Sequence, residues 1–185
     1  AADNEFQHQP PDAAQTCAQA MAEFDAAVTR LQQAGVQVLV LEKDPNLAPQ
    51  QDAVFHNNWF SVWPSGEVYL YPMRTINRRR EVRPEALQKL LQTRGIAAQF
   101  RAVAAAPGLA LEGTGALVFD HTNRVVYAAR SERCDSLLAQ QHAQALNYQL
   151  LMFDTQSSAG RAFYHSNVVL SVGEQFAVIV SEALC

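Results

Sequence analysis

Polar side chains that can bind ligands or exchange protons interrupt three apolar runs of the sequence at similar places. They are Asn57 and Asn58 in QDAVFHNNWF, Glu112 in LEGTGALVFD, and His165 and Asn167 in YHSNVVLSVG. Such groups cost free energy inside a buried strand unless they are paired. Each one, taken singly, is equally an ordinary turn residue or strand-end cap. Because all three sets precede a predicted hairpin, we expect them to line one central pocket.

The elements that must position these residues follow from the apolar periodicity. Residues 12–34 predict a helix that stops at Gly35, and VQVLVLE (36–42) then predicts a buried strand. WFSVW and VYLYP flank PSGE as a hairpin, followed by a helix in PEALQKLLQTRG and a strand in IAAQFRAV. The chain therefore begins with helix and strand and continues as strand, strand, helix, strand.

The same order then recurs. ALVFD and RVVYAA form a second hairpin, CDSLLAQQHAQALN a helix and YQLLMF a strand, and a third hairpin joins NVVLSV to FAVIVS. The repeat is roughly 50 to 60 residues long. We expect one incomplete domain over 1–185, made of a partial unit 1–50, units 51–106 and 107–155, and a partial unit 156–185. One such unit cannot bury both faces of its sheet, so the units should close into a ring or stack, and further units are expected to follow.

Composition excludes several classes of function. A net charge of -4 gives no global reason to bind nucleic acid or an anionic membrane, and no apolar stretch approaches the roughly 18 residues of a membrane span. Cys17, Cys134 and Cys185 are widely spaced and suggest neither a disulfide framework nor a zinc site. We expect a cytoplasmic protein without a metal or organic cofactor.

The motifs together resemble the guanidino-group-modifying superfamily of arginine deiminases, dimethylarginine dimethylaminohydrolases and amidinotransferases. The resemblance rests on DAVFHNN and NRRRE around the first hairpin, LEGTG and SERCD around the second, and YHSN before the third. Within the superfamily the chain is most similar to bacterial citrulline utilization hydrolases. The resemblance implies a pentein-type five-bladed α/β propeller of strand-strand-helix-strand units, only part of which is present here. This agrees with the repeat.

The resemblance also implies a mechanism on the C–N bond of a guanidino or ureido amino acid. In the family a cysteine thiolate attacks the amidine-type carbon, a histidine acts as general acid and then base, and an acidic residue orients the histidine. Glu112 and His165 match the acidic residue and the histidine. A carboxylate stabilises a protonated histidine, which would suit protonation of a leaving amine near neutral pH. The alternative for His165 is a hydrogen-bonded histidine at a strand end.

The nucleophile does not match any cysteine of the chain. In the family it follows a glycine-rich turn in the last blade, whereas Cys185 lies only 20 residues past His165 without such a turn. Cys134 begins a predicted helix, where the macrodipole could lower its pKa, but relatives commonly carry threonine there. Cys17 lies on the first helix as a core or surface residue. We expect the nucleophile beyond Cys185, and this portion alone to be inactive.

Substrate contacts are implied at the remaining matching positions. Arg133 in SERCD matches the arginine that clamps the α-carboxylate of the amino acid, and Arg78 or Arg79 in NRRRE stands where a further arginine assists. Solvated arginines at a helix start are the alternative for both motifs. Asp52 matches an aspartate that contacts the substrate.

Three amides stand where relatives commonly carry charged side chains. Asn57 and Asn58 follow the DAVF motif, and Asn167 replaces an aspartate that follows the histidine in arginine deiminases. An amide offers donor and acceptor without charge and suits a neutral ureido group, so we expect citrulline rather than arginine as substrate. Two alternatives remain: a guanidine-modifying enzyme in which Asp52 and Glu112 hold the cation, and a non-catalytic binding or scaffold propeller. A homo-oligomer or a complementary fragment that supplies missing blades is also possible.

Overall fold

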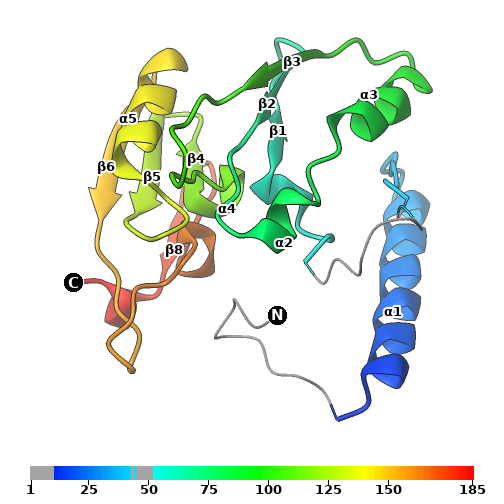
Figure 1. Cartoon of the computed structure of the whole chain (residues 1–185), viewed down its shortest axis with the longest axis horizontal. Helices are drawn as coiled ribbons and strands as arrows, with labels where there is room; N and C mark the ends of the chain where they lie inside the picture. The colour runs from blue at the N-terminus through cyan, green and yellow to red at the C-terminus, as the bar shows by residue number, and fades with distance from the viewer. Residues whose placement is uncertain (1–10, 43, 45–51) are drawn as a thin grey trace. The chain divides into compact units, whose positions relative to one another are not determined.

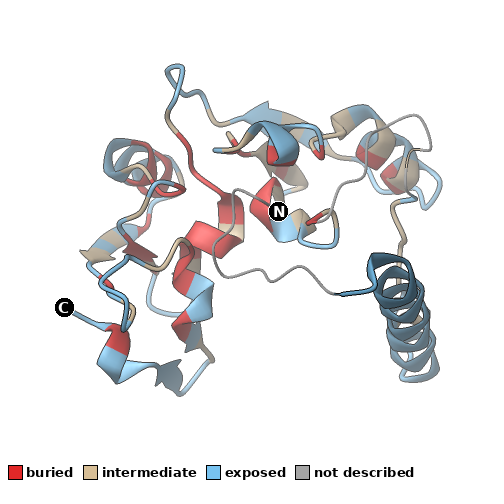
Figure 2. Ribbon diagram, turned by 60° about the horizontal axis from the view of Figure 1, so that its bottom comes forward, coloured by how far each residue is buried: buried red, intermediate tan, exposed pale blue. Residues whose placement is uncertain are grey.

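The computed structural model describes residues 11–42, 44 and 52–185, which fall into two compact units, 1–46 and 47–185. In the first unit α1 (Ala13–Gln33) forms the predicted helix. The carboxylate of Asp12 accepts a hydrogen bond from the backbone N–H of Gln15 and caps the helix start, and Gly35 follows its end at a φ of 84°. No residue of α1 is buried, as Figure 2 shows along its whole length.

The predicted strand at 36–42 is wrong. These residues have no regular structure and belong to no sheet among the residues that are described, and Val36 is 49% exposed. An apolar run predicts burial, but a strand forms only where a neighbouring strand pairs with its backbone groups. The sequence pattern carries no information on whether such a neighbour is in place.

The second unit begins with a three-stranded sheet (Figure 1). β1 (Phe60–Val62) pairs antiparallel with β2 (Glu67–Leu70), and β3 (Gln99–Ala102) pairs parallel with β2. The connection from β2 to β3 contains α2 (Ile76–Arg79) and α3 (Pro84–Gln92), and Pro84 starts α3, where its missing N–H is not needed. The predicted hairpin, helix and strand are all confirmed.

The second sheet repeats this arrangement. β4 (Leu117–Asp120) pairs antiparallel with β5 (Val125–Ala129), and β6 (Gln149–Phe153) pairs parallel with β5 after α5 (Ser136–Ala145). The third hairpin follows as β7 (Leu170–Val172) and β8 (Ala177–Ile179), and a last short helix, η3 (Ser181–Ala183), follows it. The observed order of elements is therefore that of the predicted strand-strand-helix-strand repeat.

A single helical turn precedes the first strand of every hairpin. These turns are η1 (His56–Asn58) before β1, α4 (Gly113–Ala116) before β4, and η2 (Ser166–Val168) before β7. They occupy equivalent positions in the repeat, and both η1 and η2 contact α4. The turns therefore bring together Asn58, Glu112 and His165, one polar residue from each of the three apolar runs.

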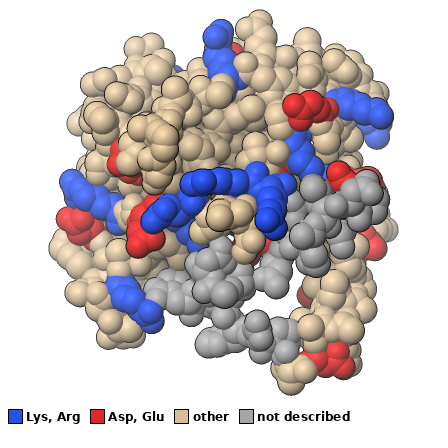
Figure 3. Space-filling view, in the orientation of Figure 1, with Lys and Arg blue, Asp and Glu red and all other residues tan. Residues whose placement is uncertain are grey.

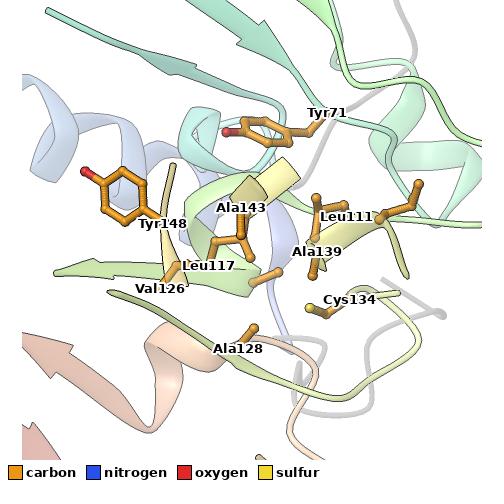
Figure 4. Close-up of a cluster of buried hydrophobic side chains, with 11 residues drawn as sticks. Tyr71, Leu111, Leu117, Val126, Ala128, Cys134, Ala139, Ala143 and Tyr148 are labelled. Carbon is orange, nitrogen blue, oxygen red and sulfur yellow. The ribbon is translucent and has the colours of Figure 1, made fainter. Parts of the chain in front are cut away.

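The core lies between the second sheet and α5. It contains Leu117 and Val126 from the sheet, Ala139 from α5, and Cys134 from the segment before that helix (Figure 4). Tyr71, which follows β2, joins the same cluster and links the first sheet to it. Among the described helices, none combines the length and apolar character that crossing a bilayer requires.

Candidate active site

Glu112 is the most completely buried charged side chain among the described residues, with 0% exposure. It stands immediately before α4. Its Oε1 accepts a hydrogen bond of 3.0 Å from the backbone N–H of Arg74, and its Oε2 accepts one of 2.8 Å from Nε2 of His165 and one of 3.3 Å from Nη1 of Arg133. The carboxylate therefore has three donors around it.

These donors decide the charge of Glu112. Burial by itself would raise the pKa of this carboxyl, but the hydrogen bond and charge of His165, the charge of Arg133 and the N–H of Arg74 together lower it. The pKa of Glu112 consequently lies below its ordinary value. The side chain is an anion at neutral pH, as the orienting residue of an acid–base pair must be.

His165 stands immediately before η2 and is buried. Because Glu112 is ionised and accepts from Nε2, the proton of a neutral imidazole lies on Nε2 and leaves Nδ1 as an acceptor. Burial lowers the pKa of His165, and the charges of Arg133 and Arg78 add to this against the raising effect of Glu112. The carboxylate does favour the protonated histidine, as expected from the sequence, but burial has the larger effect, so the pKa of His165 lies below its ordinary value.

Arg133 lies within the same group of side chains. Its guanidinium binds Glu112 and stacks on the ring of Tyr164, with Cζ 4.8 Å from the ring centroid. The backbone of Glu112 donates a hydrogen bond of 3.0 Å to the carbonyl of Arg133. The structure thus places Arg133 beside Glu112 and His165, where its charge acts on both, and its substrate-binding role stays a prediction.

Arg78 anchors the η1 turn. Its Nε donates to Glu81 at 2.8 Å, its Nη1 to Oδ1 of Asn58 at 3.1 Å, and its Nη2 to the carbonyl of Phe55 at 3.3 Å. An arginine can only donate hydrogen bonds, so this contact assigns the amide of Asn58 without ambiguity. Oδ1 of Asn58 faces Arg78, and Nδ2 is the end that points away from it.

Gly115 is the place where Asn58 and His165 approach each other. A Cβ on Gly115 would lie 2.4 Å from Nδ2 of Asn58 and 2.9 Å from Nδ1 of His165. Only a glycine leaves room for both side chains there. The amide donor of Asn58 and the acceptor nitrogen of His165 therefore both pack against Gly115 on α4.

Two acidic residues complete the buried group. Asp52 is 7% exposed and Glu81 is 3% exposed. Burial raises the pKa of Glu81 above its ordinary value, Arg78 opposes this, and the negative charges of Asp52 and Glu112 raise it further. Sequence analysis assigned no role to Glu81, although an arginine and a glutamate three residues apart on a helical turn are a recognisable pair.

The remaining predicted site residues lie outside this buried group. Asn57 is exposed, and its backbone carbonyl accepts a hydrogen bond of 3.3 Å from Oγ1 of Thr114. Asn167 is exposed and lines an open hollow of about 270 Å³ together with His121. Arg79 is exposed and donates to the carbonyls of Met73 and Arg74. Their substrate roles stay predictions.

Cys134 does not offer a thiolate to the group. Cys134 lies in the core, just ahead of α5. The helix starts only after Asp135, whose carboxylate caps it, so Cys134 is not on the first turn. Burial raises the pKa of Cys134 to about 12, and Asp135 adds to the effect. The possible activation of Cys134 by a helix macrodipole is therefore wrong. Cys17 and Cys185 are exposed.

The surface and the metal-ligating side chains offer no other obvious centre in the described part of the chain. No group of three histidine, cysteine or acidic side chains is arranged there to hold a metal ion. Figure 3 shows arginine and lysine side chains near the middle of one face with acidic side chains beside them. Arg74 with Glu132 and Arg130 with Asp154 form exposed ion pairs in the described part of the chain.

Solved structures share the fold. A mutant of dimethylarginine dimethylaminohydrolase from Pseudomonas aeruginosa in complex with citrulline is 18% identical, with a TM-score of 0.64, over 90% of this chain and 59% of that chain. Apo ArgZ, an arginine dihydrolase from the ornithine-ammonia cycle in cyanobacteria, is 16% identical, with a TM-score of 0.70, over 92% of this chain and 25% of that chain. The substrate-bound N-terminal domain of ArgZ is 19% identical, with a TM-score of 0.54, over 69% and 44%.

These similarities confirm the predicted fold class, a partial pentein α/β fold, and at such identities they show the fold alone. The chain spans well under two thirds of the length of each of these structures. No curated protein sequence matches it. The particular similarity to citrulline utilization hydrolases is not confirmed.

A family model covers the chain from end to end. The model is described as "N,N dimethylarginine dimethylhydrolase, eukaryotic" and matches residues 1–185. The match and the shared fold agree with the superfamily that the motifs indicate. The chain belongs to the N,N-dimethylarginine dimethylhydrolase family of the eukaryotic type, within the guanidino-group-modifying superfamily.

Proposed function

We propose that the protein in its full length hydrolyses a C–N bond in the guanidino or ureido group of an amino acid. The observation that carries the proposal is the buried pair of Glu112 and His165, joined at 2.8 Å, in which the histidine keeps Nδ1 as an acceptor beside Asn58 and Gly115. A neutral histidine with an ionised orienting carboxylate is prepared to accept a proton. That is the first task in activating a thiol nucleophile.

The reaction then follows in proton-balanced steps. Nδ1 of His165 takes the proton of a cysteine thiol that we place beyond Cys185, and the thiolate forms a bond to the central carbon of the substrate. The C–N bond breaks, and the departing amine receives the proton from His165. Water then gives a proton to His165 and its oxygen to the carbon, and the sulfur leaves as thiol when that proton returns. Glu112 stabilises the imidazolium in both steps.

Asn58 supports a neutral ureido group as the preferred substrate. Its oxygen is occupied by Arg78, so the N–H donors of the amide point toward Gly115 and His165. A ureido group offers a carbonyl oxygen to such donors, whereas a guanidinium offers only further N–H donors and a positive charge. We therefore propose a citrulline-like substrate for the intact enzyme.

A guanidinium substrate is the second candidate, and two observations favour it. Asp52 and Glu81 are buried carboxylates close enough for the charge of one to affect the pKa of the other. The matching family model is that of a dimethylarginine hydrolase. In this case Asp52 would hold the cation, and the donors of Asn58 would face another group of the substrate.

A direct comparison of substrates decides between the candidates. The full-length protein is given citrulline, arginine and dimethylarginine in parallel, and the release of ornithine, ammonia and dimethylamine is measured. Faster hydrolysis of citrulline supports the ureido proposal, and a preference for arginine or dimethylarginine overturns it. Binding of these compounds without release of any amine would instead indicate a binding module.

Asn58→Asp tests the role of the amide, and Asn57→Asp is the matched control. Both changes place one carboxylate on η1, but residue 58 is buried in the group and residue 57 is exposed. We expect only Asn58→Asp to shift the preference toward arginine, by about tenfold or more, which corresponds to about 1.4 kcal/mol. Equal effects of the two changes would contradict the assignment of Asn58.

A further inference from the structure

Two serine hydroxyls hold the segment that carries His165, one on each side of it. Ser166 follows the histidine directly, and Ser131 binds the carbonyl of Tyr164, which precedes it. Both hydroxyls donate a hydrogen bond to the backbone of another element of the repeat. Sequence analysis singled out neither of them.

Ser166 is 0% exposed, and its hydroxyl both donates and accepts a hydrogen bond. Oγ donates a hydrogen bond of 2.6 Å to the carbonyl of Ala116, at the end of α4, and accepts one of 2.7 Å from the backbone N–H of Ala129, at the end of β5. One hydroxyl thus ties the start of the third hairpin to two points of the second sheet's unit. Without it, a buried N–H and a buried carbonyl would lose their partner.

Ser131 links the two partners of the acid–base pair. Its hydroxyl donates a hydrogen bond of 2.8 Å to the carbonyl of Tyr164 and accepts one of 3.1 Å from the backbone N–H of Arg133. Arg133 in turn binds the Glu112 side chain through its guanidinium and the Glu112 backbone through its carbonyl. His165 is hydrogen-bonded to the same carboxylate of Glu112.

We propose that Ser131 and Ser166 are positioning residues that fix the imidazole of His165 against Glu112, so that the reactivity of the pair depends on both hydroxyls. Neither hydroxyl touches the reacting atoms in this arrangement; each acts through the backbone on which the histidine stands. The meaning of this for catalysis rests on the proposed function, but the positioning itself does not.

The ordinary alternative is that the hydroxyls only satisfy buried backbone groups. Such a role predicts a loss of stability when the hydroxyl is removed but no change at the imidazole. Positioning predicts both, since a ring that leaves its carboxylate and its dry surroundings titrates differently. The ionisation of His165 therefore separates the two roles, and it requires no substrate.

The test is an NMR titration of the histidine side chains in the intact chain, with the signal of His165 assigned by its loss in His165→Gln. Ser131→Ala and Ser166→Ala are compared with Ser61→Ala, which removes a hydroxyl of β1 that contacts Tyr71 and Trp63 instead. We expect the pKa of His165 to rise toward its ordinary value of 6.5 in the first two variants, because water reaches the ring. The control should leave it unchanged.

Rescue gives the second arm of the test. Ser131→Thr keeps the hydroxyl at a half-buried position, and we expect it to restore the titration of the parent protein. If Ser166→Ala does not fold, the comparison of Ser131→Ala with Ser131→Thr is sufficient for the test. A fall in unfolding free energy like that of Ser61→Ala, with the pKa of His165 unmoved, would overturn the proposal.

The two proposals fail separately. Absence of hydrolysis by the full-length protein, together with a moved His165 titration in the serine variants, would overturn the proposed function and leave the positioning intact. In an active full-length enzyme both alanine variants should lower kcat at least tenfold with little change in KM. A change confined to KM would argue against positioning of the acid–base pair.

Discussion

Glu112 is the residue on which the contacts of the candidate site converge, since one buried carboxylate accepts from Arg74, Arg133 and His165. A buried charge of this kind is tolerated only because it is fully paired. Its neighbours depend on it equally, as Arg133 is itself buried and positively charged. The side chain therefore has consequences for stability as well as for chemistry.

Replacing Glu112 by glutamine should destabilise the fold by about 3 to 5 kcal/mol, because Arg133 loses its buried ion pair and His165 its charged acceptor. Urea unfolding followed by circular dichroism measures the change. Glu132→Gln is the control: its ion pair with Arg74 is exposed and should contribute less than about 1 kcal/mol. Similar losses in both variants would show that the Glu112 cluster is not a tightly coupled buried network.

Sequence patterns singled out Glu112 and His165, which the structure places together, but not the details that surround them. The breaks at Glu112 and His165 are visible because polar letters stand out in apolar runs. Asn57 and Asn58 cannot be told apart in the sequence, because both are asparagines in the same motif. Only the geometry of the η1 turn buries Asn58. The N–H of Arg74 and the hydroxyl of Ser166 leave no such signal, because backbone donors and small buried hydroxyls are common everywhere.

At the scale of the elements, the short turn α4 is what brings the three polar breaks together. Gly113 adopts a φ of 44°, and a Cβ there would lie 2.4 Å from the backbone carbonyl of Asn57. At Gly115 the atoms in the way belong to the side chains of Asn58 and His165. Both glycines of GTG are therefore required, the first by the backbone of η1 and the second by the site.

Alanine at each glycine should give different results. Gly113→Ala should destabilise the protein the more strongly, because the obstructing atom is backbone and the φ is strained for a side chain. Gly115→Ala should cost less stability but displace the His165 ring, visible as a shifted imidazole signal in NMR. Thr114→Ala, between them on the same turn, serves as control. An unchanged imidazole signal in Gly115→Ala would contradict the close approach described for that site.

The elements themselves were largely predictable, and the one failure is instructive. The apolar patterns of RVVYAA and YQLLMF predicted β5 and β6. These predictions succeeded because both strands pair with close neighbours in the same repeat. The run at 36–42 has a similar composition but no partner among the described residues. Local sequence reports a preference for a strand, and the formation of one depends on a neighbour that local sequence does not encode.

At the scale of the second compact unit, a buried polar chain joins the first sheet to the second. The hydroxyl of Tyr71, after β2, lies 3.1 Å from Nε2 of His142 on α5 and 2.8 Å from Oγ of Ser61 on β1. Burial raises the pKa of Tyr71 and lowers that of His142 to about 4. The hydrogen bond therefore joins a neutral tyrosine to a neutral histidine.

This contact predicts a sensitivity to acid. The pKa of His142 is 6.5 in the unfolded chain and about 4 in the folded one, so the unfolded state binds more protons as the pH falls through this interval, and stability falls with it. Above pH 6.5 the contribution of His142 to the free energy of unfolding is fully present. Below pH 4 it has been lost, and the free energy of unfolding is lower by about 3 kcal/mol. The glutamine of His142→Gln can still form a hydrogen bond with Tyr71, but it does not titrate. Urea unfolding at pH 7 and pH 4.5 should show a smaller acid loss in this variant, and an equal loss would refute the assignment.

The central claim is that Glu112 and His165 form the acid–base pair of an enzyme that cleaves C–N bonds in ureido or guanidino amino acids. The most direct measurement is amine release from citrulline, arginine and dimethylarginine by the full-length protein and by its His165→Ala variant, at matched folded concentration. We predict release from at least one of the three, and a loss of about a thousandfold or more in kcat in the variant. Release that survives His165→Ala at the rate of the parent protein, or no release from any of the three by the parent protein, would contradict the account.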